Sequence, residues 1–77
     1  MIEIRSYHQD GSVLRVKLRC GCGKSQLQKR IVNDDYKIEC LNCHDHTTLY
    51  ELQCTATVIW QKMEWVLEGV ADAARPS

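Results

Sequence analysis

Apolar and polar residues alternate with a period of two in the first quarter of the chain. The alternation covers residues 2–8 and 12–19. Because successive side chains of a β-strand point to opposite faces, this pattern predicts two strands that are each buried on one face. The short polar segment between them favours an antiparallel hairpin.

The register of this hairpin follows from which residues must share the apolar face. Ile2 and Ile4 can share a face with the even-numbered apolar residues of the second strand only if the loop has an odd number of residues. A three-residue loop over residues 9–11 meets this condition, since glycine at its third position suits a left-handed backbone. The sequence therefore predicts that Ile4 lies opposite Val16.

The middle of the chain predicts a second hairpin and a further strand. Residues 24–32 and 36–42 are expected to form the two strands of the hairpin, joined by a turn at 33–35 whose short polar side chains favour tight turns. Residues 47–52 are rich enough in strand-forming residues to predict a third strand.

The apolar period changes to three and four residues near the C-terminus. From about residue 57 onward, this spacing predicts one amphipathic α-helix over residues 55–74. Its apolar stripe would consist of Trp60, Met63, Leu67, Val70, Ala71 and Ala74. Residues 55–59 are rich in β-branched side chains and could also continue the preceding strand, so helix starts between 55 and 61 are compatible with the pattern.

The predicted helix carries a candidate protein-binding surface. At about 100° per residue, Glu64, Glu68 and Asp72 would form an acidic row beside the apolar stripe. Trp65 would lie on the polar side near Gly69, and aromatic anchors dominate many interfaces. We therefore expect protein binding through Trp65 and the acidic row. The alternative is a helix buried on two faces, in which Trp65 belongs to the core.

Four of the five cysteines form two close pairs separated by the second hairpin. Cys20 and Cys22 enclose one residue, whereas Cys40 and Cys43 enclose two. Cysteine pairs on tight turns can converge on one tetrahedral Zn²⁺, which is closed when four protein ligands surround it. The pattern predicts one structural zinc ion bound by these four residues, and hence a zinc ribbon over residues 20–52.

Together these elements predict one small α+β domain over residues 1–77. Its parts would be a β-hairpin of antiparallel strands at 1–19, the zinc ribbon at 20–52 and one C-terminal amphipathic α-helix at 55–74. A chain of 77 residues without phenylalanine builds only a small core. The metal would therefore supply much of the stability.

The cysteines also allow a second interpretation, as buried free thiols or as a disulfide framework. Their odd number argues against complete pairing. The N-terminus shows no basic start followed by an apolar run, and no segment reaches the roughly 18 apolar residues of a membrane span. We therefore expect a cytoplasmic protein, because metal ligation is favoured over disulfides in a reducing compartment.

Three further residues bear on the metal site. His44 and His46 follow Cys43 closely, so either could replace one sulfur ligand. Histidines beside a zinc site more often lie outside its ligand set, which favours the four cysteines. Cys54 is left over and is expected to be a small buried hydrophobic residue.

The net charge of zero conceals two oppositely charged halves. Residues 1–40 carry a net charge of +3, and residues 41–77 carry −3. Arg15, Lys17 and Arg19 would project from one strand about 7 Å apart, close to the step between phosphates of a nucleic-acid strand. The candidate nucleic-acid-binding residues are Arg5, expected beside Arg15, with Arg15, Lys17, Arg19, Lys24, Lys29 and Arg30. The alternative is a solvated strand face on which basic residues oppose edge pairing.

The segment from Leu18 to Leu52 resembles a known group of proteins. Its two cysteine pairs, its polar hairpin and the run KIECLNCHDH look like the small phage-encoded zinc-ribbon regulators of the Com type. The resemblance covers under half of the chain. It implies a metal role for the four paired cysteines, together with the RNA binding and translational activation of that group.

No catalytic function is expected. Four cysteine ligands leave a zinc ion no open position for water or substrate, and no nucleophile with an adjacent base or glycine-rich phosphate loop is visible. We expect a regulatory binding protein that acts on transcription, translation or host machinery. Its partner would be a larger protein or RNA, with no membrane or small-molecule substrate. The absence of a basic recognition helix favours RNA over duplex DNA.

Overall fold

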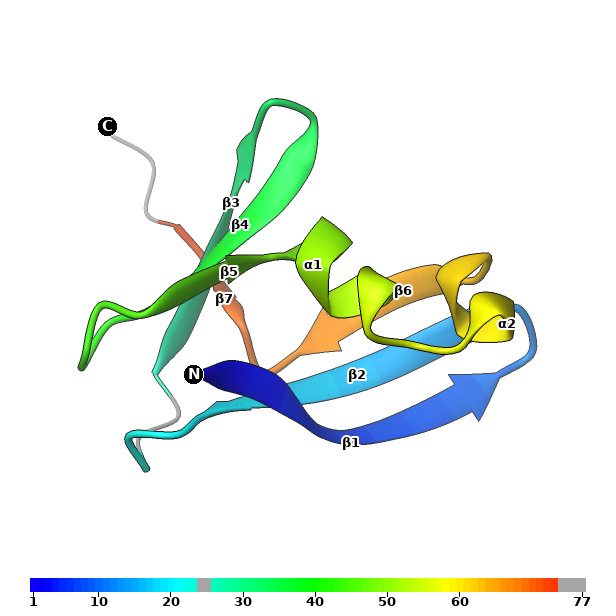
Figure 1. Cartoon of the computed structure of the whole chain (residues 1–77), viewed down its shortest axis with the longest axis horizontal. Coiled ribbons are helices and arrows are strands. Elements are labelled where there is room, and N and C mark those ends of the chain that lie inside the picture. The colour runs from blue at the N-terminus through cyan, green and yellow to red at the C-terminus, as the bar shows by residue number, and fades with distance from the viewer. Residues whose placement is uncertain (24–25, 74–77) are drawn as a thin grey trace.

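Two β-sheets organise the protein, whose computed structural model describes residues 1–23 and 26–73 (Figure 1). The first sheet has the strand order β1-β2-β6, and the second has the order β5-β4-β3-β7. The first sheet contains β1 (Ile2–Asp10), β2 (Val13–Cys20) and β6 (Glu64–Glu68). The second contains β3 (Leu27–Val32), β4 (Asp35–Cys40), β5 (His46–Thr48) and β7 (Ala71–Asp72). The β3–β4 hairpin runs across the direction of β1 and β2.

Both sheets are mixed, because each antiparallel hairpin has gained a parallel edge strand from the C-terminal part of the chain. In the first sheet, β6 pairs in parallel with β2. In the second, β7 pairs in parallel with β3. The chain from β6 to β7 therefore joins the two sheets.

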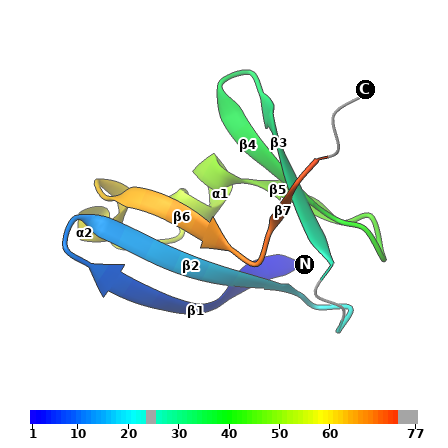
Figure 2. The same ribbon diagram turned by 180° about the vertical axis from the view of Figure 1, so that it is seen from behind.

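Two short helices, α1 (Leu49–Cys54) and α2 (Val58–Gln61), cover one face of the first sheet, and Figure 2 shows its opposite face uncovered. The strand predicted at 47–52 was wrong beyond Thr48. The side-chain oxygen of Thr48 accepts a hydrogen bond from the backbone N–H of Glu51 at 3.1 Å, and this cap starts a helix where the alternation suggested a strand. Within the described residues, no helix is long and apolar enough to cross a membrane.

The core is centred on β2. Leu14 and Val16 are fully buried on its inner face, whereas the residues between them are exposed on the outer face. Ile38 brings β4 of the second sheet into the same core. The buried hydrophobic residues described are Ile2, Leu14, Val16, Leu18, Cys20, Leu27, Ile38, Cys40, Leu52, Leu67 and Val70, with Ile4, Leu49, Trp60, Met63 and Trp65 packed against them.

The helix predicted over residues 55–74 was wrong. Of residues 55–73, which the structure describes, only Val58–Gln61 are helical, and Glu64–Glu68 form the strand β6. In β6, Trp65 and Leu67 lie beside Leu14 and Val16 of β2, on the inner face. The free edge of β2 offers backbone hydrogen bonds to this segment, and that long-range pairing overrides the local helical spacing. Residue 74, the last of the predicted helix, lies outside the described residues.

The turn of the first hairpin also differs from the prediction. It consists of two residues, Gly11-Ser12, rather than three residues at 9–11. Gly11 adopts a φ of 61°, which a side chain would disfavour. Together with a bulge in β1, this turn places Ile4 opposite Leu18 and not opposite Val16.

A β-bulge in β1, and not a three-residue loop, places the even-numbered apolar residues of both strands on the same face. The register shifts between Ile4 and Ser6, so one extra residue is inserted in β1. Before the bulge, the even-numbered Ile4 faces the core, and beyond it the odd-numbered Tyr7 pairs with the buried Val16. The apolar face was therefore predicted correctly, but the feature that produces it was not.

The second hairpin forms where the sequence predicts it, but its turn has two residues instead of the three at 33–35, and its second strand ends at Cys40 instead of residue 42. Its strands are β3 and β4, and Asn33 and Asp34 form the turn with φ angles of 53° and 63°. Asparagine and aspartate tolerate this left-handed backbone better than most residues do. Residues 24 and 25, where this hairpin was expected to begin, lie outside the described residues.

Candidate metal centre

Two backbone turns carry the four paired cysteines, each at the end of a core strand. The first knuckle, residues 20–23, follows β2, and the backbone N–H of Gly23 donates to the carbonyl oxygen of Cys20 at 3.1 Å. The second knuckle, residues 40–44, follows β4, and the N–H of His44 donates to the carbonyl oxygen of Cys40 at 2.9 Å. Gly23 and His44 both have positive φ, 87° and 65°. The chain therefore folds back sharply at each pair.

The N-terminal residue braces both knuckles. The carbonyl oxygen of Met1 accepts a hydrogen bond from the N–H of Gly21 at 2.9 Å, and its amino group lies 2.7 Å from a carboxylate oxygen of Asp45. The hydrogen bond to Asp45 raises the pKa of the Met1 amino group, and the same bond lowers the pKa of Asp45. The carbonyl oxygen of Asp45 in turn accepts from the N–H of Cys40 at 2.8 Å. The two knuckles thus belong to one bonded network.

The four sulfur atoms come together as the sequence predicts. The Sγ atoms of Cys20, Cys22, Cys40 and Cys43 all lie within 4.8 Å of one another. Across the knuckles, Cys20 and Cys43 are 3.4 Å apart, and Cys22 and Cys40 are 3.7 Å apart. Four sulfurs at about 2.3 Å from a tetrahedral ion would be about 3.8 Å from one another. The cluster is therefore close enough to coordinate one metal ion.

Each knuckle offers one buried and one exposed sulfur ligand. Cys20 and Cys40 belong to the core, whereas Cys22 and Cys43 are exposed. The backbone N–H of Cys22 lowers the pKa of Cys20, but burial and the three neighbouring thiols outweigh it and raise the pKa to about 12. A bound cation would remove this penalty, because it favours the thiolate form.

The remaining candidate ligands lie outside this cluster. His44 and His46 are exposed, and Nδ1 of His44 lies 3.9 Å from a carboxylate oxygen of Glu39. The prediction for Cys54 was wrong, because this residue is exposed on α1 instead of buried. A hydrogen bond with the Cys54 thiol raises the pKa of the Tyr50 phenol.

The predicted basic stripe exists, but acidic residues flank it. Arg15, Lys17 and Arg19 are exposed on the outer face of β2, the central strand of the first sheet. Nε of Arg19 donates to Glu3 of β1 at 2.9 Å, and Lys17 pairs with Glu68 of β6. The strands on both sides of β2 therefore place negatively charged residues beside the basic stripe.

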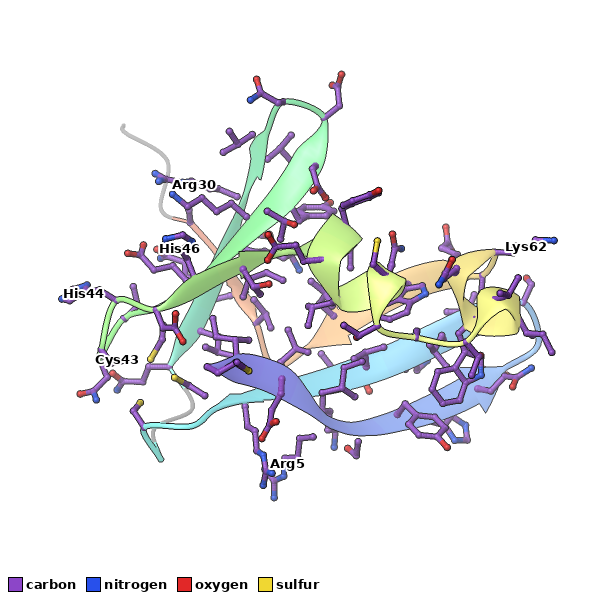
Figure 3. The ribbon with its side chains drawn as sticks, viewed as in Figure 1. Arg5, Arg30, Cys43, His44, His46 and Lys62 are labelled. Atoms are coloured by element: carbon purple, nitrogen blue, oxygen red, sulfur yellow. The ribbon has the colours of Figure 1, made fainter. Side chains whose placement is uncertain are left out.

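The other predicted nucleic-acid-binding residues are dispersed. Arg5 lies at the bulge, and His8, not Arg5, is opposite Arg15. Lys29 and Arg30 belong to β3 in the second sheet, and Figure 3 shows Arg30 far from Arg5. Lys24 lies outside the described residues.

The predicted protein-binding residues are not brought together either. Trp65 points toward the core, and its Nε1 donates to the carbonyl oxygen of Trp60 at 2.8 Å. Glu64 and Glu68 alternate with Trp65 on β6, so they lie on the outer face. Asp72 belongs to β7 and lies 3.8 Å from Nζ of Lys29. The acidic row required a helix that does not form here.

A surface that the sequence analysis missed lies at α2. Val58 and Ile59 are 64% and 73% exposed, although both are aliphatic. The neighbouring Trp60 contacts Tyr7 of β1, with 4.2 Å between ring centroids. The only sequence signal was the adjacent pair of β-branched residues, which the helical interpretation assigned to its start.

Comparisons with models of protein families, with curated proteins and with solved structures find no match to this chain. The resemblance to Com-type regulators therefore remains a prediction from the cysteine pattern.

Proposed function

We propose that this protein is a non-enzymatic zinc-binding regulatory protein, in which one structural Zn²⁺ fixes the fold and the surface binds a macromolecular partner. The observation that carries the proposal is the convergence of four cysteine sulfurs within 4.8 Å. Thiolate ligands in a tetrahedral arrangement favour zinc or iron over magnesium and calcium, which take oxygen ligands. Four protein ligands complete the coordination of zinc and leave it no catalytic position.

A structural role is also supported by where the ligands lie. Cys20 ends a strand of the first sheet, and Cys40 ends a strand of the second. One ion bound by both knuckles would join the two sheets. Binding energy of that kind contributes directly to folding.

Metal analysis of the protein purified under reducing conditions tests this proposal. We expect about one zinc per chain, as for other four-cysteine structural sites. Replacing Cys40 by Ser should release the metal, whereas replacing Cys54 by Ser should not. A folded sample without zinc, or with iron in its place, would refute the assignment of zinc.

A protein partner is supported by the exposed aliphatic residues of α2. Val58 and Ile59 present apolar area to water without a structural partner among the described residues. The double substitution Val58→Ser and Ile59→Ser should reduce partner affinity by at least about 2 kcal/mol if these residues are interface anchors. Ile31→Ser is the matched control, because Ile31 is also aliphatic and is 68% exposed, but lies in the β3–β4 hairpin. Pulldown from lysate treated with nuclease measures the effect.

RNA binding through the outer face of the first sheet is the second candidate. The exposure of Arg15 and Lys17 supports it, and the flanking carboxylates oppose it. If both residues contact phosphates, neutralising each by Gln should flatten the log–log salt dependence by about 0.7 for single-stranded RNA. Lys62→Gln is the control, since Lys62 lies near α2 (Figure 3). No binding at about 50 mM salt, where phosphate contacts are strongest, would exclude this function.

A further inference from the structure

The sulfur cluster contains two cross-knuckle pairs, each made of one exposed and one buried cysteine. Exposed Cys43 lies 3.4 Å from buried Cys20, and exposed Cys22 lies 3.7 Å from buried Cys40. Figure 3 places Cys43 at the end of the molecule away from α2, where the second knuckle turns back. An oxidant in solution would therefore reach one member of each pair first, with its partner directly behind it.

We propose that the metal centre is also a peroxide-sensitive thiol site, in which oxidation releases the ion and joins Cys20 to Cys43 and Cys22 to Cys40. This inference rests on the proposed zinc site. It names the modified residues, the oxidant class and the pairing, none of which follows from metal binding alone.

The chemistry requires one hydrogen peroxide for each pair. The exposed thiolate of Cys43 attacks one peroxide oxygen, the O–O bond breaks, and a sulfenic acid and hydroxide are formed. Cys20, which is still a thiolate because the bound ion displaced its proton, then attacks that sulfur and expels a second hydroxide, and a disulfide forms as the ion leaves. Two thiolates are oxidised by two electrons in all, and the peroxide is reduced to two hydroxides that become water on protonation. The same sequence joins Cys22 to Cys40.

The pairing across the knuckles follows from proximity. A disulfide has an S–S length of about 2.05 Å, so each pair must close by less than about 2 Å once the metal has left. Side-chain rotation can supply such a movement while the backbone bonds of the knuckles remain. The competing product, a bond between Cys40 and Cys43 within the second knuckle, would leave the two knuckles unconnected.

The cross-knuckle bonds have a structural consequence. They join the end of β2 to the end of β4, as the proposed metal ion does, so the oxidised protein keeps its two sheets connected. Folding would depend on metal only in the reduced state. The oxidised state would be folded and metal-free.

Peroxide titration of the zinc-loaded Cys54→Ser protein tests the inference. This variant removes the exposed fifth thiol, which could otherwise exchange with the new disulfides. We expect complete release of zinc, followed with a chromogenic chelator, and loss of all four remaining thiols. Tryptic digestion should then yield peptide 20–24 cross-linked to peptide 38–62, and fragmentation between the two cysteines of each peptide assigns the pairing.

The outcomes separate the inference from the proposal on which it rests. Retention of zinc, a Cys40–Cys43 bond, or sulfinic acids without cross-links would overturn the inference and leave the zinc site intact. Absence of zinc before peroxide is added would overturn both. Circular dichroism gives an independent readout: the oxidised, metal-free protein should keep its full strand signal, whereas the reduced, metal-free protein should lose at least the part that comes from the second sheet.

Asn42 provides a second test that does not remove a ligand. Its side-chain Nδ2 lies 3.6 Å from Sγ of Cys22 and donates toward it. A hydrogen bond to a thiolate stabilises its charge and lowers its reactivity. Asn42→Ala should therefore bind the same amount of zinc and release it several-fold faster in peroxide. An unchanged release rate would show that Cys22 is not a site of attack.

Discussion

The two ends of the first sheet are built in different ways, although β2 runs through both. Near the turn, Leu14 and Val16 are fully buried against Leu67 and the tryptophans that surround them. At the other end, β2 finishes in Cys20, and the structure continues as knuckles held by backbone hydrogen bonds and sulfur contacts. Apolar burial stabilises both ends, but the second end, where Ile2, Leu18 and Leu27 are buried, also carries the four-cysteine cluster.

The second sheet belongs to the end that carries the four-cysteine cluster. Leu27, Ile38 and Cys40 attach its base to the core, but Ile31 and Val32 near its tip are exposed. The tip of the second hairpin therefore extends beyond the core. If the knuckles separate, this sheet loses its attachment while β2 and β6 keep theirs. The comparison teaches that one strand can connect a region held by its apolar core to a region that carries a four-cysteine cluster.

Metal removal should have the largest effect of the changes that test this comparison. Four-cysteine zinc sites contribute on the order of 10 to 16 kcal/mol of apparent binding energy, more than a domain of this size can lose. We expect chelation under reducing conditions to abolish cooperative unfolding, with β3 and β4 losing hydrogen-exchange protection first. Equal protection of both sheets before and after chelation would contradict the division into two regions.

Acidification should have the second-largest effect, because it should weaken metal binding by the four cysteines. The raised pKa of Cys20 keeps this thiol protonated across the neutral range without metal, so binding must displace its proton. Each displaced proton makes affinity fall about tenfold per pH unit, which gives at least about a thousandfold loss from about pH 8 to about pH 5. Competition with a chromogenic chelator at several pH values measures it. A flat profile would mean that Cys20 is not a ligand.

Leu14→Ala should damage the apolar end without touching the metal. Leu14 is fully buried, so its truncation should cost about 2 to 5 kcal/mol of the free energy of unfolding. Denaturant titration measures this loss, and metal analysis should still find about one zinc per chain. Loss of zinc in the folded variant would show that the two ends are more strongly coupled than the comparison implies.

Removing the N-cap side chain of α1 or α2 should have a smaller effect on the free energy of unfolding. Thr48→Ala removes the acceptor for the N–H of Glu51 at 3.1 Å and should cost about 1 kcal/mol. Thr57 makes the equivalent bond to the N–H of Trp60 at a longer 3.5 Å. Thr57→Ala should therefore cost less, as measured by denaturant titration. The reverse order would mean that α2, and not α1, fixes the path between the sheets.

Cys54→Ser should have the smallest effect. Cys54 is exposed on α1 and lies outside the sulfur cluster, so the change in stability should stay within about 0.5 kcal/mol. Zinc content should not change. A reduced zinc content would show that the ligand set includes this fifth sulfur.

The metal centre was predictable from sequence because its information is local. Cys20 with Cys22 and Cys40 with Cys43 are close along the chain, and turn-forming residues accompany each pair. A hairpin between them leaves few ways to arrange four sulfurs other than together. The second hairpin was predictable for the same reason, because Asn33 and Asp34 supply the left-handed turn within the segment itself.

The C-terminal segment was not predictable, because its structure depends on a distant partner. Residues 64–68 fit a helical spacing, but as a strand they also place Trp65 and Leu67 on one face, and the choice between the two structures lies with β2, about fifty residues earlier. Once this segment is a strand, Trp65 faces the core and the acidic row disappears. Every surface hypothesis that relied on the helix changed with it.

The sequence by itself determined the local features of this protein: the four-cysteine cluster, the apolar face of the first hairpin and the turn of the second. Only the tertiary structure decided which strands share a sheet, where the bulge shifts the register, and which charges surround the basic stripe. The physical reason is that turns and short-range ligand pairs are fixed by neighbouring residues. Strand pairing instead depends on backbone groups that any sequence carries, so the packed core must select the partner.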